Sequence, residues 1–318
     1  MNKHTLPTLV FFGTPEFARY CLAHLVETGF NVKGVVTAPD RKAGRGKKVT
    51  HSAVKDYAIA KKLEVLQPTN LKSPEFIGQL QALGAEVYAV VAFRMLPKVV
   101  WSLPRLGTIN LHASLLPDYR GAAPINWVLI NGETETGVTT FLIDEAIDSG
   151  AVLMKETTSI VPEDNFETLH NRLLEIGAPL LAATLIQLSN KTISAQKQVE
   201  KEHTKAAPKL NAENTRIQWT STLKQLVNHI RGLNPYPGAW TYLENSGQEL
   251  RIKIFEAEAL YETPKEENGT LVVKDSKLMI AHSEGYLICK EIQLPNKKRM
   301  DVKSLLNGYT IEVDARVY

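Results

Sequence analysis

An asparagine and a histidine stand two residues apart at the end of an apolar stretch. The stretch reads INLH, in which Asn110 and His112 alternate with Ile109 and Leu111. On a β-strand, residues i and i+2 point to the same side, so the two polar side chains project together. An asparagine amide can donate a hydrogen bond to a developing oxyanion, and a histidine can stabilise that oxyanion or move a proton near neutral pH. The alternative is a histidine that is simply buried and hydrogen-bonded.

A loop rich in carboxylates follows in the segment LIDEAIDSGAVL. It carries Asp144, Glu145 and Asp148 between two apolar runs. A carboxylate near His112 would favour the imidazolium form and fix the orientation of the ring. Asp-Ser-Gly by itself is also an ordinary turn sequence. The two segments together are therefore more specific than either one alone.

These side chains need a sheet to position them. Apolar runs at 8–13, 31–37, 86–92 and 107–112 alternate with helical patterns, and their unbroken apolarity suits strands buried on both faces. We expect a Rossmann-like, doubly wound α/β domain with a mostly parallel sheet, closed by a long helix over 165–188. Ligands bind such sheets at the carboxyl ends of the strands, where 107–112 delivers His112.

The first strand-to-helix turn tests one class of ligand. It reads FGTPEF, with Gly13 alone and no G-x-G-x-x-G fingerprint. Close approach of the backbone to a pyrophosphate normally needs the second glycine, so a dinucleotide site is disfavoured. A tight turn is the simpler interpretation.

The pattern changes after the long helix. Residues 190–208 are polar and lysine-rich, which predicts a linker. A helical pattern at 221–233 and five short strand patterns separated by turn sequences follow, as in a small β-barrel of the oligonucleotide-binding (OB) type. We therefore expect a catalytic domain over 1–189, a linker over 190–208 and an OB-like domain over 209–318.

Composition limits the remaining classes. The 318 residues are 44% hydrophobic and 22% charged, with a net charge of +3, which is typical of a globular protein and only weakly basic. The two cysteines, Cys21 and Cys289, lack metal-ligand spacing, so we expect neither a disulfide framework nor a cysteine-ligated zinc site. The first apolar run is too short for a signal peptide or a membrane span, and we expect a cytoplasmic protein.

The motifs taken together resemble a known family. N-x-H-x-S-L-L-P-x-x-R-G-x-x-P over 110–124, followed by D-x-x-x-D-S-G over 144–150, is similar to the formyltransferases that use 10-formyltetrahydrofolate. The resemblance implies that Asn110, His112 and Asp148 are catalytic and that no metal takes part. It also implies folate contacts from Phe93, Arg94, Met95, Leu96, Ser114, Leu115, Leu116, Pro117 and Asp144. The chain departs from many relatives at Ala146 and at Phe93-Arg94, which affects pterin contacts rather than the chemistry.

The acceptor of the formyl group is indicated by a basic loop. The segment PDRKAGRGKK carries five cations among flexible glycines, which suits a loop that moulds onto phosphates. It resembles the inserted loop with which the tRNA-acting members of the family contact the acceptor stem. We therefore expect tRNA contacts from Arg41, Lys42, Arg45, Lys47 and Lys48. A solvated lysine-rich loop is the alternative.

The C-terminal part supports the same acceptor by resemblance only. From residue 209 to 318 it holds 15 Lys and Arg against 14 Asp and Glu, so composition does not indicate RNA binding. The segment IRGLNPYPGAW nevertheless resembles the opening of the C-terminal barrel in the tRNA-acting members. The cluster Lys297, Lys298 and Arg299 could form a local tRNA-binding patch.

The resemblance implies formyl transfer from 10-formyltetrahydrofolate to the α-amino group of methionyl-initiator tRNA, by a monomer that does not bind membranes. Two alternatives stay open. One is a formyltransferase acting on the amine of a nucleotide-linked sugar, which would share the catalytic residues and lack the basic loop. The other is a dinucleotide-binding Rossmann protein, which the missing glycine fingerprint disfavours.

Overall fold

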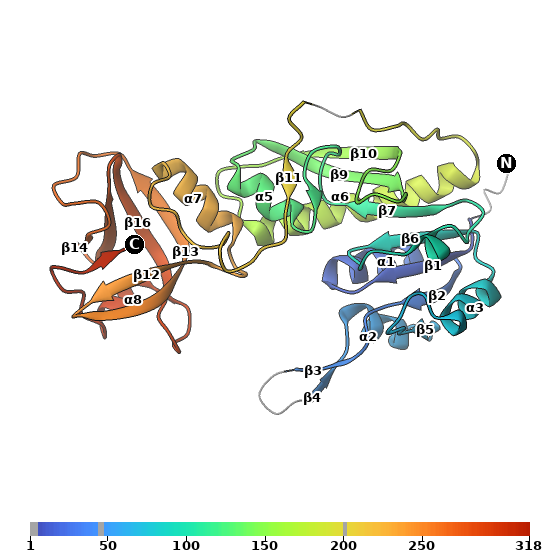
Figure 1. Cartoon of the computed structure of the whole chain (residues 1–318), viewed down its shortest axis with the longest axis horizontal. Helices are drawn as coiled ribbons and strands as arrows, with labels where there is room; N and C mark the ends of the chain where they lie inside the picture. The colour runs from blue at the N-terminus through green and yellow to red at the C-terminus, as the bar shows by residue number, and fades with distance from the viewer. Residues whose placement is uncertain (1–5, 44–47, 200–201) are drawn as a thin grey trace. The chain divides into compact units, whose positions relative to one another are not determined.

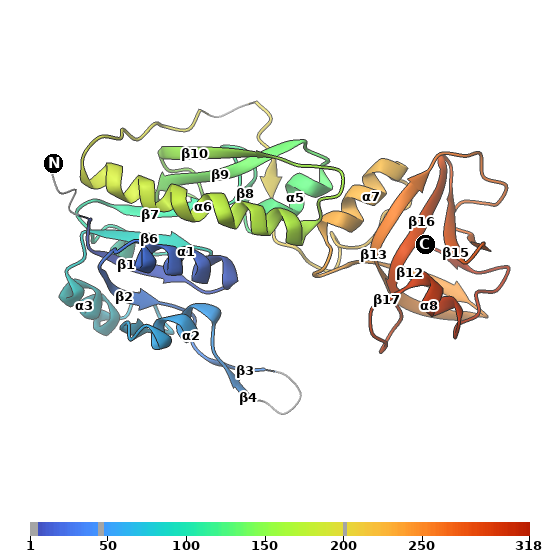
Figure 2. The ribbon, with the colours of Figure 1, turned by 180° about the vertical axis from the view of Figure 1, so that it is seen from behind.

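The computed structural model describes residues 6–43, 48–199 and 202–318 (Figures 1 and 2). The chain forms two compact units. The first contains residues up to 121 together with 136–158 and 171–206, and the second contains 122–135, 159–170 and 207–318. The catalytic domain predicted from the sequence thus contributes two segments to the second unit. The assignment of catalysis to residues 1–189 and of tRNA binding to residues 209–318 stays a prediction.

A seven-stranded sheet organises the first unit. Its strands lie in the order β10 (Val152–Ser159), β9 (Glu135–Leu142), β7 (Thr108–His112), β6 (Val87–Val91), β1 (Leu9–Gly13), β2 (Val32–Val36) and β5 (Val65–Leu66). The strands from β7 to β5 pair in parallel, whereas β9 pairs with β7 in the antiparallel sense. The predicted mostly parallel α/β sheet is therefore confirmed.

Helices cover the sheet of the first unit. They are α1 (Glu16–Glu27), α2 (Ala53–Ala60), α3 (Pro74–Leu83), α4 (Lys98–Trp101) and the greater part of α6 (Phe166–Ser189). One buried cluster joins alternate residues of β1 and β6, such as Val10, Phe12 and Val90, to Phe76 of α3 and Val100 of α4. Strand alternation therefore turns Asn110 to the same face as Val90, its direct partner in β6.

Helix α6 packs closely against the sheet. A side chain at Gly177 would lie 3.1 Å from Leu111 of β7, so the glycine permits the close approach. The helix continues through Pro179. Among the residues that the structure describes, α6 has the length and apolarity of a membrane span. Half of its most apolar window is buried in the protein, as in an ordinary core helix, so this is weak evidence for a span.

Local capping explains where several helices begin. Ser52 and Ser73 accept hydrogen bonds from the backbone amides of Lys55 and Phe76, in the first turns of α2 and α3. Helix α3 ends at Gly84 in the left-handed conformation, with φ of 57°. Ser52 and Ser73 thus mark where α2 and α3 begin, and Gly84 ends α3 before the chain enters β6.

The second unit is built around an antiparallel sheet that curls into a barrel. Its strands lie in the order β14 (Leu271–Lys274), β15 (Lys277–His282), β16 (Gly285–Gln293), β13 (Gln248–Leu260), β12 (Ala239–Asn245) and β18 (Arg316–Val317), with β17 (Met300–Asp301) beside β16. A bridge between Thr270 and Arg316 joins the two ends of this order. The expected OB-like barrel is confirmed, and it has two more short strands than the sequence predicted.

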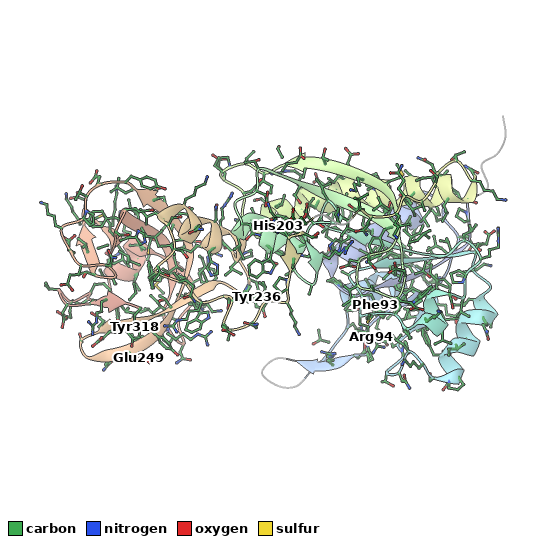
Figure 3. All side chains as sticks on the ribbon, turned by 45° about the horizontal axis from the view of Figure 1, so that its top comes forward. Phe93, Arg94, His203, Tyr236, Glu249 and Tyr318 are labelled. Carbon is green, nitrogen blue, oxygen red and sulfur yellow. The ribbon has the colours of Figure 1, made fainter. Side chains whose placement is uncertain are left out.

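Helices and side chains complete the second unit. Helix α7 (Leu223–Gly232) begins with a capping box made by Thr222 and Gln225, and it contributes Leu226 and Ile230 to the barrel core. Helices α5 (Pro124–Ile130) and α8 (Val302–Leu306) belong to the same unit. At the outer edge, the Tyr318 hydroxyl donates a hydrogen bond to Glu249 of β13 (Figure 3).

Candidate active site

The predicted pair of polar residues lies at the end of β7. Asn110 pairs with Val90 and Phe141, and His112 pairs with Thr139, so both side chains leave the strand on one face. His112 is buried and Asn110 is partly exposed. Within the described residues, the Asn110 side chain makes no hydrogen bond. Its amide is therefore available to a ligand.

The two ring nitrogens of His112 have different surroundings. Nε2 lies 2.8 Å from the carbonyl oxygen of Tyr119, and Nδ1 lies 3.8 Å from Oδ2 of Asp148. A carbonyl oxygen only accepts hydrogen bonds, so Nε2 carries a hydrogen and donates it to Tyr119. Because 3.8 Å is longer than a hydrogen bond, Nδ1 is the ring nitrogen left for Asp148 and for a bound ligand.

Because β9 runs antiparallel to β7, its last residue Leu142 pairs with Ile109, and the loop that follows turns back along β7 to bring Asp148 to His112. Oδ1 of Asp144 accepts hydrogen bonds from the Ala146 amide at 3.2 Å and the Ser149 hydroxyl at 2.7 Å. Asp148 itself has a φ of 52°, a left-handed conformation that non-glycine residues seldom adopt. Its Oδ2 accepts a hydrogen bond from the Gly121 amide at 2.9 Å. Asp144 thus shapes the loop, and Asp148 faces His112.

Hydrogen bonds shape the Ser-Leu-Leu-Pro loop from inside. The buried Ser114 hydroxyl donates to the carbonyl of Asp118 at 2.7 Å. Thr139 of β9 donates to the Ser114 carbonyl at 2.6 Å and accepts from the Leu116 amide at 3.2 Å. The side chains of Ser114 and Leu116 are fully buried, so they position the loop. Those of Leu115 and Pro117 are partly exposed.

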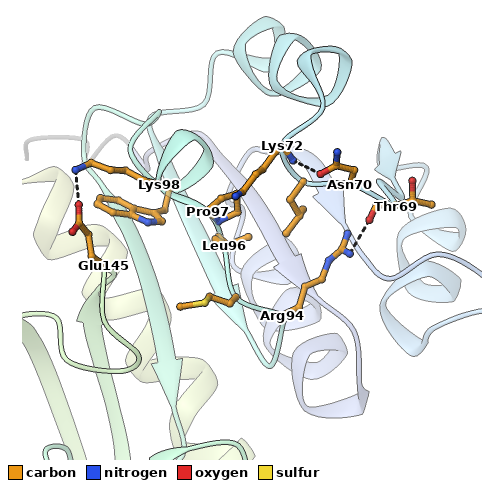
Figure 4. A pocket seen from close by; sticks show the side chains of 11 residues that line it. Thr69, Asn70, Lys72, Arg94, Leu96, Pro97, Lys98 and Glu145 are labelled. Carbon is orange, nitrogen blue, oxygen red and sulfur yellow. Dashed lines mark hydrogen bonds and ion pairs between the residues drawn. The ribbon is translucent and has the colours of Figure 1, made fainter.

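A pocket of about 630 Å³ lies between the loops after β5 and β6 (Figure 4). It is lined by residues 69–72 and 94–98 together with Trp101 and Glu145. Three predicted folate contacts, Arg94, Met95 and Leu96, form part of its wall. Lys98 pairs with Glu145 at 2.5 Å, whereas no described residue forms an ion pair with Lys72. The pocket thus combines apolar surface with an unpaired cation.

Arg94 joins the two loops that form this pocket. Its guanidinium donates to the carbonyls of Pro68 and Thr69, the latter at 3.1 Å. It also lies 5.7 Å from the ring of Phe93 (Figure 3). The Phe93 ring in turn contacts Phe12 of β1. Phe93 and Arg94 thus hold the pocket wall in place.

The structure divides the predicted folate and catalytic residues into two groups. The pocket lining does not include Asn110, His112 or Asp148, nor the loop 114–117. Both groups lie in the first unit, and they share the loop 144–150. Glu145 of this loop lines the pocket, and Asp148 lies beside His112.

The basic loop emerges as a hairpin of β3 (Arg41–Ala43) and β4 (Lys48–Thr50), which pair antiparallel. It projects away from the sheet of the first unit in both views (Figures 1 and 2). Arg45 and Lys47 lie outside the described residues, and Arg41 is exposed. At the base of the hairpin, Asp40 accepts hydrogen bonds from Gln67 at 2.8 Å and Lys55 at 2.5 Å, which lower the pKa of its carboxyl group. The acid nearest the hairpin is thus already paired.

The C-terminal cations differ in their surroundings. Lys297 and Lys298 are exposed, and neither forms an ion pair with a described residue. Arg299 pairs with Glu291, donates to Asn234 at 2.9 Å and lies 4.6 Å from the ring of Phe255. These three contacts already occupy the Arg299 guanidinium within the second unit.

Some residues of the site were not predicted. Thr139 and Lys155, which donates to the Leu116 carbonyl, hold the Ser-Leu-Leu-Pro loop from β9 and β10. Arg120 belongs to the quoted motif, yet its partner Gln198 lies in the predicted linker, where no local pattern marks it. Within the described residues, no group of three or more His, Cys, Asp or Glu is arranged to hold a metal ion.

Two family models match consecutive parts of the chain. Residues 8–185 match the model of the formyl transferase family, and residues 209–310 match that of the formyl transferase C-terminal domain. The chain is 49% identical over 310 residues to a methionyl-tRNA formyltransferase of Flavobacterium johnsoniae, with 98% of both chains covered. It is 45% identical over 316 residues to one of Bacteroides thetaiotaomicron, again with 98% of both chains covered.

Solved structures share the fold at low sequence identity. An N-formyltransferase from Helicobacter canadensis, in complex with folinic acid and dTDP-3-aminofucose, superposes with a TM-score of 0.64 at 19% identity, covering 90% of this chain and 98% of that one. HypX from Aquifex aeolicus in complex with tetrahydrofolic acid gives 0.63 at 17% identity, covering 98% of this chain and 51% of that one. These structures show the fold, while the family models and the full-length relatives above show that the chain belongs to the formyltransferase family, among the methionyl-tRNA formyltransferases.

Proposed function

We propose that the protein transfers the formyl group of 10-formyltetrahydrofolate to the α-amino group of methionyl-initiator tRNA. The observation that carries this proposal is the approach of Asp148 to His112, beside the free amide of Asn110, in a chain that matches methionyl-tRNA formyltransferases over nearly its whole length. The product would be N-formylmethionyl-tRNA for the initiation of translation. The curated relatives of this name are bacterial, which supports a cytoplasmic location.

The chemistry follows from the surroundings of the three side chains. The α-amine attacks the formyl carbon on N10 of the folate and forms a tetrahedral intermediate. The Asn110 amide donates to its oxyanion, and a His112 ring that carries protons on both nitrogens donates from Nδ1, because Nε2 is already bonded to Tyr119. Asp148 assists transfer of the amine proton to the departing N10. The C–N10 bond then breaks, and the oxyanion collapses to the formamide.

Two sections of the first unit would hold the folate. Backbone groups of residues 93–96 meet the pterin, and the unpaired Lys72 suits a carboxylate of the glutamyl tail. Leu115 and Pro117 contribute partly exposed apolar surface, whereas Ser114, Leu116 and Asp144 act by shaping their loops. Holding both substrates in a reactive orientation supplies up to roughly 7–11 kcal/mol of the barrier in favourable cases.

The tRNA would be bound by cations outside the catalytic cluster. The hairpin of β3 and β4 contains Arg41, Lys42 and Lys48, and the predicted contacts Arg45 and Lys47 lie outside the described residues. In the second unit, the exposed Lys297 and Lys298 are the phosphate contacts. Arg299 holds their loop in place through its bonds to Asn234 and Glu291. This assignment gives residues 1–189 the chemistry and residues 209–318 a share of tRNA binding, in a monomeric enzyme.

The experiment is an assay of formylation with 10-formyltetrahydrofolate and methionyl-initiator tRNA. Wild-type protein and the His112→Ala variant are compared, and formylmethionine released from the tRNA is measured. We expect formylation by the wild type and its loss in the variant. Folate binding without formylation of the tRNA, together with turnover of a dTDP-linked amino sugar, would overturn the proposed acceptor.

A further inference from the structure

One buried polar side chain of the predicted linker reaches the catalytic aspartate. Gln198 lies in a segment whose neighbours Gln196, Lys197 and Val199 are exposed, yet only 8% of its own surface is accessible. The segment is fixed to the sheet just before it, because the backbones of Gln196 and Val152 exchange two hydrogen bonds of 2.8 Å. Gln198 therefore follows directly after an anchored point on the edge of the first unit.

The side-chain amide of Gln198 makes four hydrogen bonds. Nε2 donates to the carbonyl of Asp148 at 2.9 Å and to the carbonyl of Gly150 at 2.8 Å. Oε1 accepts from Nη2 of Arg120 at 2.7 Å and from its Nε at 3.2 Å. Both N–H groups and the oxygen thus have partners, as a buried amide requires. The side chain crosslinks residues 148–150 to residue 120.

This crosslink acts at a point where the backbone needs support. Asp148 adopts a left-handed conformation with φ of 52°, which persists only where its surroundings hold it. The Gln198 side chain donates to the backbone carbonyl of Asp148, while the Gly121 amide donates to Oδ2 of the Asp148 carboxylate. The adjacent residues Arg120 and Gly121 are therefore linked to both ends of Asp148. Together these contacts set the 3.8 Å separation of Oδ2 from Nδ1 of His112.

We infer that Gln198 is a positioning residue for formyl transfer, acting through Asp148. The inference rests on the proposed function. Only a primary amide offers two donors to the carbonyls of 148 and 150 and an acceptor to Arg120. A glutamate in its place keeps the shape and the contact with Arg120, but it turns an oxygen toward two carbonyl oxygens. The Gln198→Glu variant therefore removes the hydrogen bonds to the carbonyls of 148 and 150 while it keeps the packing of the segment.

The test compares Gln198→Ala and Gln198→Glu with Gln196→Ala, a matched control whose side chain is exposed. We expect both Gln198 variants to lower kcat by about 10- to 100-fold, the range for misplacing a catalytic group by about 1 Å or losing its support. The dissociation constant for the folate should stay within a factor of about two, and Gln196→Ala should match the wild type. Unchanged kcat in folded Gln198→Glu would overturn the inference.

A second comparison separates positioning from general support of the structure. In an Asp148→Ala background, removal of Gln198 should lower kcat no further, because its effect passes through Asp148. A further loss of tenfold or more would mean that Gln198 acts elsewhere.

A third measurement does not need the tRNA substrate. The imidazole ¹⁵N chemical shifts of His112 should change in both Gln198 variants and stay the same in Gln196→Ala. Unchanged shifts overturn the inference, whereas a wild-type protein that forms no formylmethionyl-tRNA overturns the proposed function.

Discussion

Gly150 closes the turn that presents Asp148, and replacing it with alanine should damage the site directly. A Cβ at this position would lie 1.7 Å from the carbonyl oxygen of Leu142 and 2.9 Å from its carbonyl carbon. Real Cβ contacts are almost never shorter than 3.0 Å. The obstacle is backbone rather than a flexible side chain, so the turn must move by roughly 1 Å or more.

That displacement acts on the contacts that hold the catalytic loop. The amide of Leu142 donates to the Ala151 carbonyl at 2.9 Å, and Gln198 donates to the Gly150 carbonyl at 2.8 Å. Moving the turn strains or breaks both bonds and carries Asp148 away from His112. A misplacement of about 1 Å in a catalytic site can cost about 100-fold in rate, and overpacking costs about 1–3 kcal/mol in stability.

The assay is the rate of formylmethionyl-tRNA formation at saturating substrates, with the thermal midpoint measured in parallel. We expect Gly150→Ala to lower kcat by about 100-fold at a temperature where the protein stays folded. Gly78→Ala is the matched control, because a Cβ at Gly78 in α3 meets nothing within 4 Å. Glycine in a helix interior costs about 0.5–1 kcal/mol relative to alanine, so the control should be slightly more stable and fully active. A Gly150→Ala enzyme with kcat within about threefold of the wild type would refute this reasoning.

Four further expectations concern separate groups. Asp148→Asn should lower kcat far more than it weakens folate binding, as measured by turnover and by ligand titration; equal losses would remove Asp148 from the chemistry. Neutralising Arg45, Lys47 and Lys48 should raise KM for tRNA. It should also reduce the slope of the logarithm of tRNA affinity against the logarithm of salt concentration by about 1 per lost phosphate contact, whereas Lys33→Ala should change neither. Arg299→Ala should lower stability by about 1–2 kcal/mol in urea denaturation, because it loses Glu291, Asn234 and Phe255, while Lys297→Ala and Lys298→Ala should affect only tRNA binding. Desolvation lowers the pKa of His229 below its usual 6.5, so the unfolded chain binds a proton first and stability should fall as the pH drops below about 6.5. The slope is at most about 1.4 kcal/mol per pH unit, and urea midpoints at pH 7.5 and 5.5 should show it in the wild type and a smaller one in His229→Gln.

The sequence alone determined the local parts of the molecule. Unbroken apolar runs specified the parallel strands, because buried strands need apolar side chains on both faces. The two-residue spacing of Asn110 and His112 fixed their common face, since side chains alternate along a strand. Turn sequences and alternating patterns in the C-terminal part specified the barrel strands. All these signals act within a few residues, which is why they can be read without the fold.

Tertiary structure decided how distant segments complete the site. The antiparallel pairing of β9 starts the loop 143–151 beside Ile109, and no local pattern predicts that this loop returns along β7 to His112. Tertiary packing also buried Ser114, so that its hydroxyl bonds to the Asp118 carbonyl within the same loop. It placed Gln198, from a polar segment, against Asp148. Arg299, one of three cations in a row, is bound to Glu291 only because β16 and β17 lie side by side. The physical reason is common to all of them: a polar side chain has the same local sequence signature whether it faces solvent or a partner across the fold, and only packing decides between the two.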